Sequence, residues 1–380
     1  MNYWLFFLCI DWLLFIGVSL TVLYMLVFSI ASLFSKTSIT PTSRTQNRFI
    51  ILIPAYKQDS TILSTVKSVL SQNYPQRLFD VIVISDHQQE MTNMHLAQMP
   101  ITLLTPNFEK STKVKSLQYA ILNLPEFKIY DIVIIIDGHN IVEQDFLEKM
   151  NNAYESSGTK TIVSHRIPKN RDTSTARIDS VFSEINNSIF RRAHITMGLS
   201  SSINGSGTAF DFTWFKSAIM KIRSSNTDKE LEISLLRQGI YIDYMDNIFI
   251  YEEKARSTEE FNRQRRHWMI HQFHSAIANI RYLPMALFHR RYDLADKILQ
   301  WLLIPRLLLI DIMFFMSAVL PFVYFTLVIK WWFIDILFGF ACAFATPNYL
   351  VDKHWDKDFL TLPYRTIRSV VRKIFRKLHK

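Results

Sequence analysis

The chain has few of the residues that cross-link a fold or give its backbone extra freedom. It contains only two cysteines, Cys9 and Cys342, and 8 glycines in 380 residues. Both cysteines lie in apolar stretches, where they count as small apolar residues, so we expect neither a disulfide framework nor a cysteine-based metal site. We also find no internal repeat and no low-complexity linker, which excludes a repeat protein and a string of loosely joined domains.

Charged residues are scarce in two long stretches. Residues 4–34 hold a single formal charge, Asp11, and residues 299–344 form a second apolar stretch that is long enough to cross a bilayer twice. A spanning helix needs about 20 apolar residues. We therefore expect a transmembrane helix in residues 1–35, a transmembrane hairpin in residues 299–350, and one domain between them that works at a membrane surface. A cleaved signal peptide is disfavoured for the first stretch, because the stretch is too long and no basic segment precedes it.

Basic residues are also missing from the first ten positions, although the formal net charge of the chain is +10. Lys36, Arg44 and Arg48 follow the first stretch, and residues 365–380 carry seven Lys and Arg. Because positive charge near spans favours the cytoplasmic side, we expect an integral protein of the plasma or inner membrane with its N-terminus outside and its middle domain in the cytoplasm. Residues 330–332, Lys-Trp-Trp, are expected in a short exposed turn of the hairpin.

The middle domain shows the pattern of an α/β fold. Apolar, β-branched runs at residues 49–53, 81–84 and 132–136 end at Pro54, at Asp86 and at Asp137, and residues 61–70 and 114–122 have helical spacing. This order predicts a mostly parallel sheet with helices on both faces. In such sheets ligands bind beyond the carboxyl ends of the strands, so Asp86 and Asp137 are binding candidates.

A set of motifs with chemical potential follows in a fixed order along this domain. They are Ile53-Pro54-Ala55-Tyr56, Asp86, Ser111-Thr112-Lys113-Val114, Asp137-Gly138-His139, residues 203–210 (Ile-Asn-Gly-Ser-Gly-Thr-Ala-Phe), Thr227-Asp228-Lys229-Glu230 and Gln264-Arg265-Arg266-His267-Trp268. The ordered set resembles the membrane-bound family 2 glycosyltransferases, the group with cellulose, chitin and hyaluronan synthases and ceramide glucosyltransferase. The resemblance covers roughly residues 48–268 and implies a GT-A-like glycosyltransferase domain in residues 45–260.

The resemblance implies a nucleotide site at the first strands. Pro54 and Tyr56 would belong to the nucleotide-binding turn, and Lys113 would open a helix that faces the nucleotide. Asp86 takes the place of an aspartate that accepts a hydrogen bond from the uracil ring of a UDP-sugar, for which a carboxylate is suited. Taken alone, Asp86 would be better explained as a helix N-cap and Lys113 as a solvated surface residue.

The resemblance further implies a divalent metal, Mn²⁺ or Mg²⁺, at Asp137-Gly138-His139. The family has a second carboxylate where this chain has His139. Imidazole suits Mn²⁺ better than Mg²⁺, which prefers oxygen ligands. Either His139 is a ligand to the softer ion, or it is an exposed loop residue and Asp137 holds the metal alone.

Asp228 matches the aspartate that, in the family, takes the proton from the attacking acceptor hydroxyl. An inverting sugar transfer needs one such base. The acid that precedes it in the family is Thr227 here, and Glu230 and Glu232 are nearby alternatives. Two glycines within residues 203–210 imply a close approach of the backbone beside the acceptor.

The segment Gln264-Arg265-Arg266-His267-Trp268 resembles the signature that closes the donor site in the membrane branch of the family. Its Trp would support the acceptor sugar, and its Gln and basic residues would reach the diphosphate, although His267 stands where the family has Arg. Amphipathic spacing after this segment favours interfacial helices in residues 261–298, and the basic pattern of residues 351–380 favours an amphipathic tail on anionic membrane lipid rather than on nucleic acid.

The leading hypothesis is therefore an inverting membrane glycosyltransferase. It would move a sugar from a nucleotide sugar, expected to be UDP-linked, to a growing glycan or a lipid acceptor for cell-surface polysaccharide or glycolipid synthesis. Three spans are few for a polymer channel, which favours a lipid-linked acceptor or partner subunits that form an export pore. The alternative is a non-catalytic relative that acts as a scaffold or regulator, because His139 and His267 both replace residues that face the diphosphate.

Overall fold

The computed structural model describes residues 3–38 and 40–351, and its centre is an eight-stranded sheet in the order β3-β2-β1-β4-β7-β6-β8-β5. The strands are β1 (Phe49–Tyr56), β2 (Phe79–Asp86), β3 (Thr102–Leu104), β4 (Ile132–Ile135), β5 (Asn140–Val142), β6 (Thr161–Pro168), β7 (Thr208–Asp211) and β8 (Asp243–Glu252). Four of the seven strand pairings are parallel, and β7 runs antiparallel to both of its neighbours. The predicted α/β fold is confirmed, in the form of a mixed sheet.

Helices cover both faces of this sheet. Before and between the strands lie α1 (Tyr3–Leu33), α2 (Ile62–Leu70), α3 (Glu90–Ala97), α4 (Lys113–Leu122), α5 (Phe146–Ser157), α6 (Ser174–Asn187), α7 (Ala193–Thr196), α8 (Phe212–Ile219) and α9 (Thr227–Arg237). After the sheet come α10 (Thr258–Asn279), α11 (Leu283–Phe288), α12 (Tyr292–Leu302), α13 (Arg306–Val323) and α14 (Phe325–Ala345).

The continuous apolar sequence of β1 follows from its burial on both faces. Ile50 and Leu52 belong to a core that α4, α8 and α9 complete, whereas Ile51 and Ile53 belong to a second core with α2 and α5. Because side chains alternate along a strand, a strand between two helix layers needs an apolar residue at every position. This explains why the apolar runs predicted the central strands.

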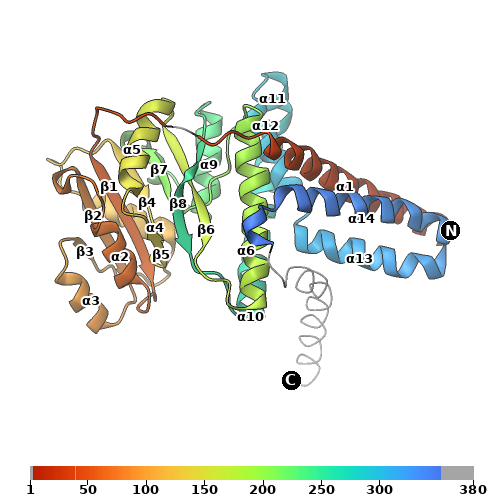
Figure 1. The fold of residues 1–380 in the computed structure, drawn as a ribbon, viewed down its shortest axis with the longest axis horizontal. Coiled ribbons are helices and arrows are strands. Elements are labelled where there is room, and N and C mark those ends of the chain that lie inside the picture. Colours follow the sequence, from red (N-terminus) through yellow and green to blue (C-terminus); the bar gives the residue numbers. More distant parts are fainter. Residues whose placement is uncertain (1–2, 39, 352–380) are drawn as a thin grey trace.

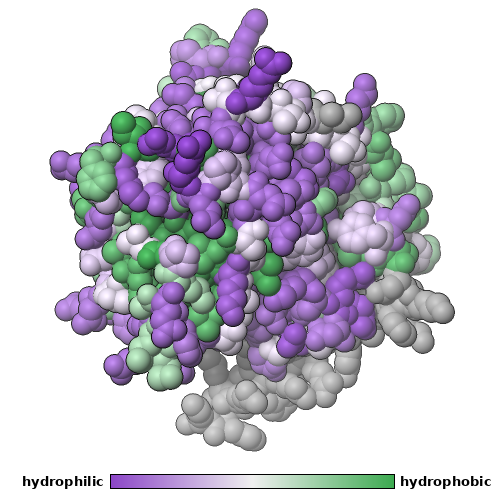
Figure 2. All heavy atoms as spheres, turned by 60° about the vertical axis from the view of Figure 1, so that its left-hand side comes forward, coloured by the Kyte–Doolittle hydropathy of each residue, from purple (hydrophilic) through white to green (hydrophobic). Residues whose placement is uncertain are grey.

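Three helices, α1, α13 and α14, are long enough and apolar enough to cross a membrane. They pack on one another through a shared core that includes Val22 of α1, Met313 of α13 and Ile334 of α14, and their outer sides stay exposed. Figure 1 shows them projecting from one end of the molecule, with the sheet at the other end and α6 and α10 between. The face on the sheet side is largely hydrophilic (Figure 2), as expected for a surface in water.

The turn of the C-terminal hairpin differs from the prediction. Residues 330–332 lie inside α14, and the break between the two helices is at Tyr324. Lys330 forms an ion pair with Asp11 of α1, and Trp331 is buried and donates a hydrogen bond to the same carboxylate at 2.9 Å. A buried partner charge on another helix, which the local sequence does not reveal, explains why this Lys-Trp-Trp segment is not a turn. The predicted amphipathic tail lies outside the described residues, apart from Val351.

Candidate active site

Three charged side chains meet beside the carboxyl ends of the central strands. Asp137 follows β4, Lys113 is the first residue of α4, and Asp228 lies in the first turn of α9. Lys113 Nζ is 2.8 Å from Asp137 Oδ1 and 3.8 Å from Asp228 Oδ1. The sequence places these residues more than 20 positions apart, and the fold brings them into one cluster.

The charges of this cluster reinforce one another. Burial alone would lower the pKa of Lys113, but the nearby charges of Asp137 and Asp228 outweigh it and raise that pKa. Burial would raise the pKa of Asp137, but Lys113, His139 and Arg166 together lower it. Both groups of the ion pair therefore stay charged at neutral pH.

Gly205 shapes the surroundings of Asp228. It has a φ of +87°, and a Cβ at this position would lie 2.6 Å from Asp228 Oδ2. Only glycine combines this backbone conformation with such a close approach. The two glycines noted in residues 203–210 thus include one that makes room for the candidate base.

The alternative bases have different surroundings. Glu232 is fully buried, and its carboxylate accepts hydrogen bonds from Lys229 Nζ and from the backbone N–H of Ile203, each at 3.0 Å, and pairs with Lys297 at 3.3 Å. A carboxylate that is enclosed in this way stabilises the junction of α9 and α12 and has no free face for a substrate. Glu230 does not line the cavity described below.

The proposed nucleotide turn comprises the last residues of β1, Pro54 to Tyr56, with the loop that follows, and it lies beside the end of β2. Tyr56 and Asp86 are register partners, Tyr56 is 50% exposed, and Pro54 is half-buried. Asp86 Oδ1 lies 2.6 Å from Nδ1 of His87, whereas Asp86 Oδ2 is buried without a hydrogen-bond partner. An unpaired buried carboxylate oxygen is costly, so an N–H donor from a ligand would be favoured here.

The turn after β4 contacts this nucleotide turn directly. Gln58 Nε2 lies 3.1 Å from His139 Nδ1, and Thr61 donates a hydrogen bond to the carbonyl oxygen of Gly138 at 2.9 Å. A Cβ on Gly138 would lie 2.3 Å from Gln58 Oε1, so a larger residue would push the two turns apart. Gln58 orients the His139 ring, and Nε2 can bind a cation only in the tautomer with the proton on Nδ1, in which the Gln58 amide oxygen faces that N–H.

The chemistry of this turn suits a metal with two protein ligands. Within residues 3–38 and 40–351 no three His, Cys, Asp or Glu side chains converge on one point. Asp137 and His139 would supply one oxygen and one nitrogen, and the remaining ligands would come from a diphosphate and water, as is usual for such ions. The residues therefore fit a divalent cation that arrives with a nucleotide.

A cavity of about 490 Å³ begins at this cluster and reaches α1 and the start of α13. Lys113 and Asp228 line one part, and Thr21 and Met25 of α1 and Ile304 line another. One face of α10 supplies Gln264, Arg265, Trp268, Met269, His271 and Gln272. Arg266 and His267 are exposed and do not line the cavity, because they lie on the other side of the helix.

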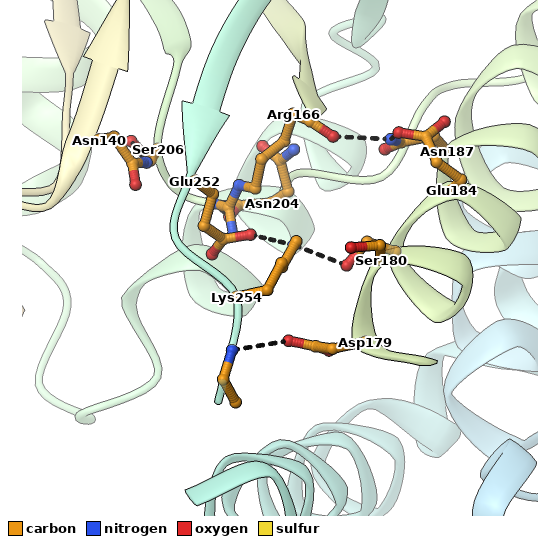
Figure 3. Close-up of polar contacts among 12 residues, drawn as sticks. Asn140, Arg166, Asp179, Ser180, Glu184, Asn187, Asn204, Ser206, Glu252 and Lys254 are labelled. Atoms are coloured by element: carbon orange, nitrogen blue, oxygen red, sulfur yellow. Dashed lines mark hydrogen bonds and ion pairs between the residues drawn. The ribbon is translucent and has the colours of Figure 1, made fainter. Parts of the chain in front are cut away.

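Sequence reasoning missed a charged group in the wall of this cavity. Arg166 of β6 forms an ion pair with Glu252 of β8 at 2.9 Å, and Lys254 contacts the same carboxylate. Figure 3 shows the three side chains between the strands and α6, with Asn204 beside Arg166. Burial would raise the pKa of Glu252, but Arg166 and Lys254 lower it. The available signal was a charged residue near the carboxyl end of a strand, which is also what marked Asp137.

Comparisons with known proteins agree with this geometry. The model of the family described as glycosyltransferase like family 2 matches residues 46–270. Among solved structures, the mannosyltransferase PcManGT from Pyrobaculum calidifontis, in complex with GDP-Man and Mn²⁺, is 13% identical with a TM-score of 0.57, over 96% of this chain and 98% of that one. S. aureus TarS 1–349 in complex with UDP-GlcNAc is 13% identical with a TM-score of 0.40, over 64% and 72%. No curated protein matches. At 13% identity and a TM-score of 0.57, the mannosyltransferase shows a shared fold only.

Proposed function

The chain belongs to the glycosyltransferase-like family 2 and is a glycosyltransferase, and on that premise we propose that it transfers a sugar with inversion from a nucleotide sugar to a glycan or lipid acceptor at a membrane. The observation that carries the proposal is the position of Asp228. Its carboxylate faces the same cavity as Lys113, which is itself in contact with Asp137. A candidate base thus lies beside the charges that would hold the diphosphate.

The transfer uses these residues in one displacement. Asp228 accepts the proton of the acceptor hydroxyl, and the oxygen attacks C1 of the sugar on the face opposite the diphosphate. The bond from C1 to the diphosphate oxygen breaks as the new C1–O bond forms, and the nucleoside diphosphate leaves with the electron pair. Lys113 neutralises charge on the leaving diphosphate. A divalent cation held by Asp137 and His139 would add to this charge stabilisation.

We propose a UDP-linked donor because of Asp86. Its unpaired Oδ2 suits the imide N–H of uracil. Guanine also presents ring N–H donors, and the mannosyltransferase above is described with GDP-Man, so a donor panel includes both nucleotides. Pro54 and Tyr56 border the same turn.

The direct test is release of nucleoside diphosphate by the purified full-length protein in detergent. UDP- and GDP-sugars are screened with Mn²⁺ and Mg²⁺, with the protein inactivated at Asp228 as the blank. Nucleotide release that depends on one donor supports the proposal. If no donor of the panel is turned over while nucleotide still binds, the scaffold or regulatory alternative becomes the better hypothesis.

We further propose that α1, α13 and α14 span the membrane with the sheet on the cytoplasmic side. Their length and composition support the spans, and the basic residues Lys36, Arg44 and Arg48 that follow α1 support this orientation. Single cysteines introduced at exposed positions of the sheet domain, on a background without Cys9 and Cys342, should react with an impermeant maleimide only in inside-out vesicles. Labelling from outside the cell would contradict the orientation.

A further inference from the structure

The wall of the cavity carries far more positive than negative charge. Its cationic residues are Lys113, Arg166, Arg191, Lys229, Lys254, Arg265 and Arg306, and its anionic residues are Asp179, Asp228 and Glu252. Most of the cations have a carboxylate partner nearby, which lies either in the wall or just behind it. Arg191 and Arg306 have none within 4 Å among the described residues. The excess therefore falls on two guanidinium groups.

Arg306 is the first residue of α13, where this helix meets α6. Its Nη2 donates hydrogen bonds to the backbone oxygen of Phe182 at 2.8 Å and to Asn186 Oδ1 at 2.6 Å. Its Nη1 is buried and has no hydrogen-bond partner. The guanidinium thus is held firmly by one nitrogen and presents the other without a partner, which is costly unless a ligand supplies an acceptor.

A second guanidinium lies close to Arg306. Arg265 of α10 and Arg306 contact the same Phe182 ring, with guanidinium carbons 5.4 Å and 4.8 Å from its centroid. Arg265 pairs with Asp179, so only one negative charge serves the two groups. Two like charges around one ring repel, and an anion between them would relieve that repulsion.

Arg191 in the cavity wall adds to the same imbalance. It is buried and donates to Ser202 O at 3.1 Å and to Asn187 Oδ1, both uncharged acceptors. Burial lowers the pKa of Arg191 to about 10, which reflects the cost of holding this charge away from water. A nearby anion would offset part of this cost.

The cavity wall also has apolar residues from α1 and from the chain around the start of α13. Met25 of α1, Ile304 and Leu307 of α13 line it, and the Ile304 backbone N–H donates to Thr21 Oγ1 of α1 at 3.3 Å. An occupant of the cavity would therefore meet the carboxylate of Asp228, cations without a carboxylate partner, and apolar side chains at two helices that are apolar enough to cross a membrane.

We propose that the acceptor is an amphiphile that carries an oxyanion, a phosphate or a carboxylate, and that Arg306 binds this oxyanion at the membrane end of the cavity. The inference rests on the proposed function, since it names the class of acceptor for the transfer at Asp228. The reacting hydroxyl lies at Asp228, the anion at Arg306 beside Arg265, and the alkyl part between α1 and the start of α13.

The test measures binding, so that it does not depend on turnover. The full-length protein in phosphatidylcholine nanodiscs is titrated with octyl β-glucoside, octyl β-glucuronide and octyl phosphate, and with a nucleotide in parallel. At least one anionic probe should bind about tenfold or more tightly than the neutral glucoside, because a hydrogen bond to a charged group is lost with the neutral probe. The glucuronide and the phosphate distinguish a sugar acid from a lipid phosphate.

The variant Arg306→Gln should abolish this preference and leave nucleotide affinity unchanged. Arg281→Gln is the matched control, because it removes the same charge at a residue that is exposed and does not line the cavity. Arg306→Lys keeps the charge and should keep part of the preference. It serves as the second variant if Arg306→Gln folds poorly. Equal binding of all probes to the wild type, or a preference that survives in Arg306→Gln, overturns the inference. If nucleotide binding and donor turnover persist while the inference fails, the proposed function still stands. If they are absent, that result counts against the proposed function and not against the anion site.

Discussion

The two halves of the candidate site are built in different ways. The half at the strand ends holds Asp86 at the end of β2, Asp137 just after β4, and Lys113 at the start of α4, which packs on β1 and β2. The half nearer α1 and α13 is formed by one face of α10 and by the start of α13, and its aromatic residue Trp268 is 42% exposed. The first half is anchored to the buried sheet and its Lys113 has carboxylate partners, whereas the second carries guanidinium groups that have no carboxylate partner among the described residues.

This difference suggests a division of labour. A cluster of ion-paired groups anchored at strand ends is suited to the donor and to the chemistry, which need fixed distances. A helical face beside cations that lack a carboxylate partner is suited to an acceptor that carries an anion. Substitutions in the first half should therefore change turnover, and substitutions in the second half should change the affinity for the acceptor.

The largest effect is expected for Asp228→Asn. The side chain stays close to isosteric and the start of α9 is kept, but the proton acceptor is gone. Transfer should fall by at least about 100-fold, with the affinity for the nucleotide little changed. Initial rates of nucleoside diphosphate release and calorimetric nucleotide binding measure the two quantities. Glu230→Gln on the same helix turn is the control, and a comparable loss there would move the role of base away from Asp228.

The sequence predicted the first half of the site better than the second. Runs of apolar residues predicted the carboxyl ends of β1, β2 and β4 to within three residues of those observed, and the carboxyl ends of neighbouring parallel strands meet at one edge. The closeness of Lys113, Asp137 and Asp228 was implied by the family resemblance, and the contacts among them are now described. The antiparallel insertion of β7 was not predicted, because a strand of four residues next to a helix gives little periodic signal.

The second half could not be predicted in the same way. The sequence pattern of α10 shows a helix but does not fix which of five consecutive residues faces the cavity, since that depends on its packing against α6 and α12. Arg306 and Arg166 lie far from the motifs in sequence, and only the fold brings them to the cavity. Lys330 was misplaced for the same reason, because its partner Asp11 is 319 positions away.

A tenfold effect is expected next, on the membrane side. Trp268 lines the cavity and its neighbour His267 does not, so the two residues form a matched pair on one helix. Trp268→Ala should raise the KM for the acceptor about tenfold through loss of an aromatic surface, with donor KM nearly constant. His267→Ala decides whether the donor role implied by the family motif applies here. If His267→Ala loses more activity than Trp268→Ala, His267 and not Trp268 faces the site in the working enzyme, which requires a rotation of α10 about its axis.

A smaller effect, of a few-fold, is expected for His139→Asp. This variant restores two carboxylates at the turn after β4, and an aspartate oxygen can still accept a hydrogen bond from Gln58 Nε2. Because Mg²⁺ prefers oxygen ligands, activity should shift from Mn²⁺ towards Mg²⁺. Activity measured over a concentration series of each metal gives the ratio. An unchanged ratio would identify His139 as a bystander, and activity in the variant alone would identify a decayed enzyme.

The smallest effect is expected from pH acting on the ion pair between Lys113 and Asp137. The pKa of Asp137 is lowered, so the stability that it contributes is present above the ordinary Asp value of about 3.9 and is lost only as the pH falls through the lower folded value. The pKa of Lys113 is raised, so its contribution is present below the ordinary Lys value of about 10.4 and is lost only as the pH rises through the higher folded value. The difference in Tm between the wild type and Asp137→Asn, measured in detergent without nucleotide, should therefore stay constant from pH 7 to pH 9 and shrink in acid. A difference that changes between pH 7 and pH 9 would mean that a group other than Lys113 and Asp137 titrates in the strand-end half. The contrast between an ion-paired half at the strand ends and a second half with unpartnered cations would then fail.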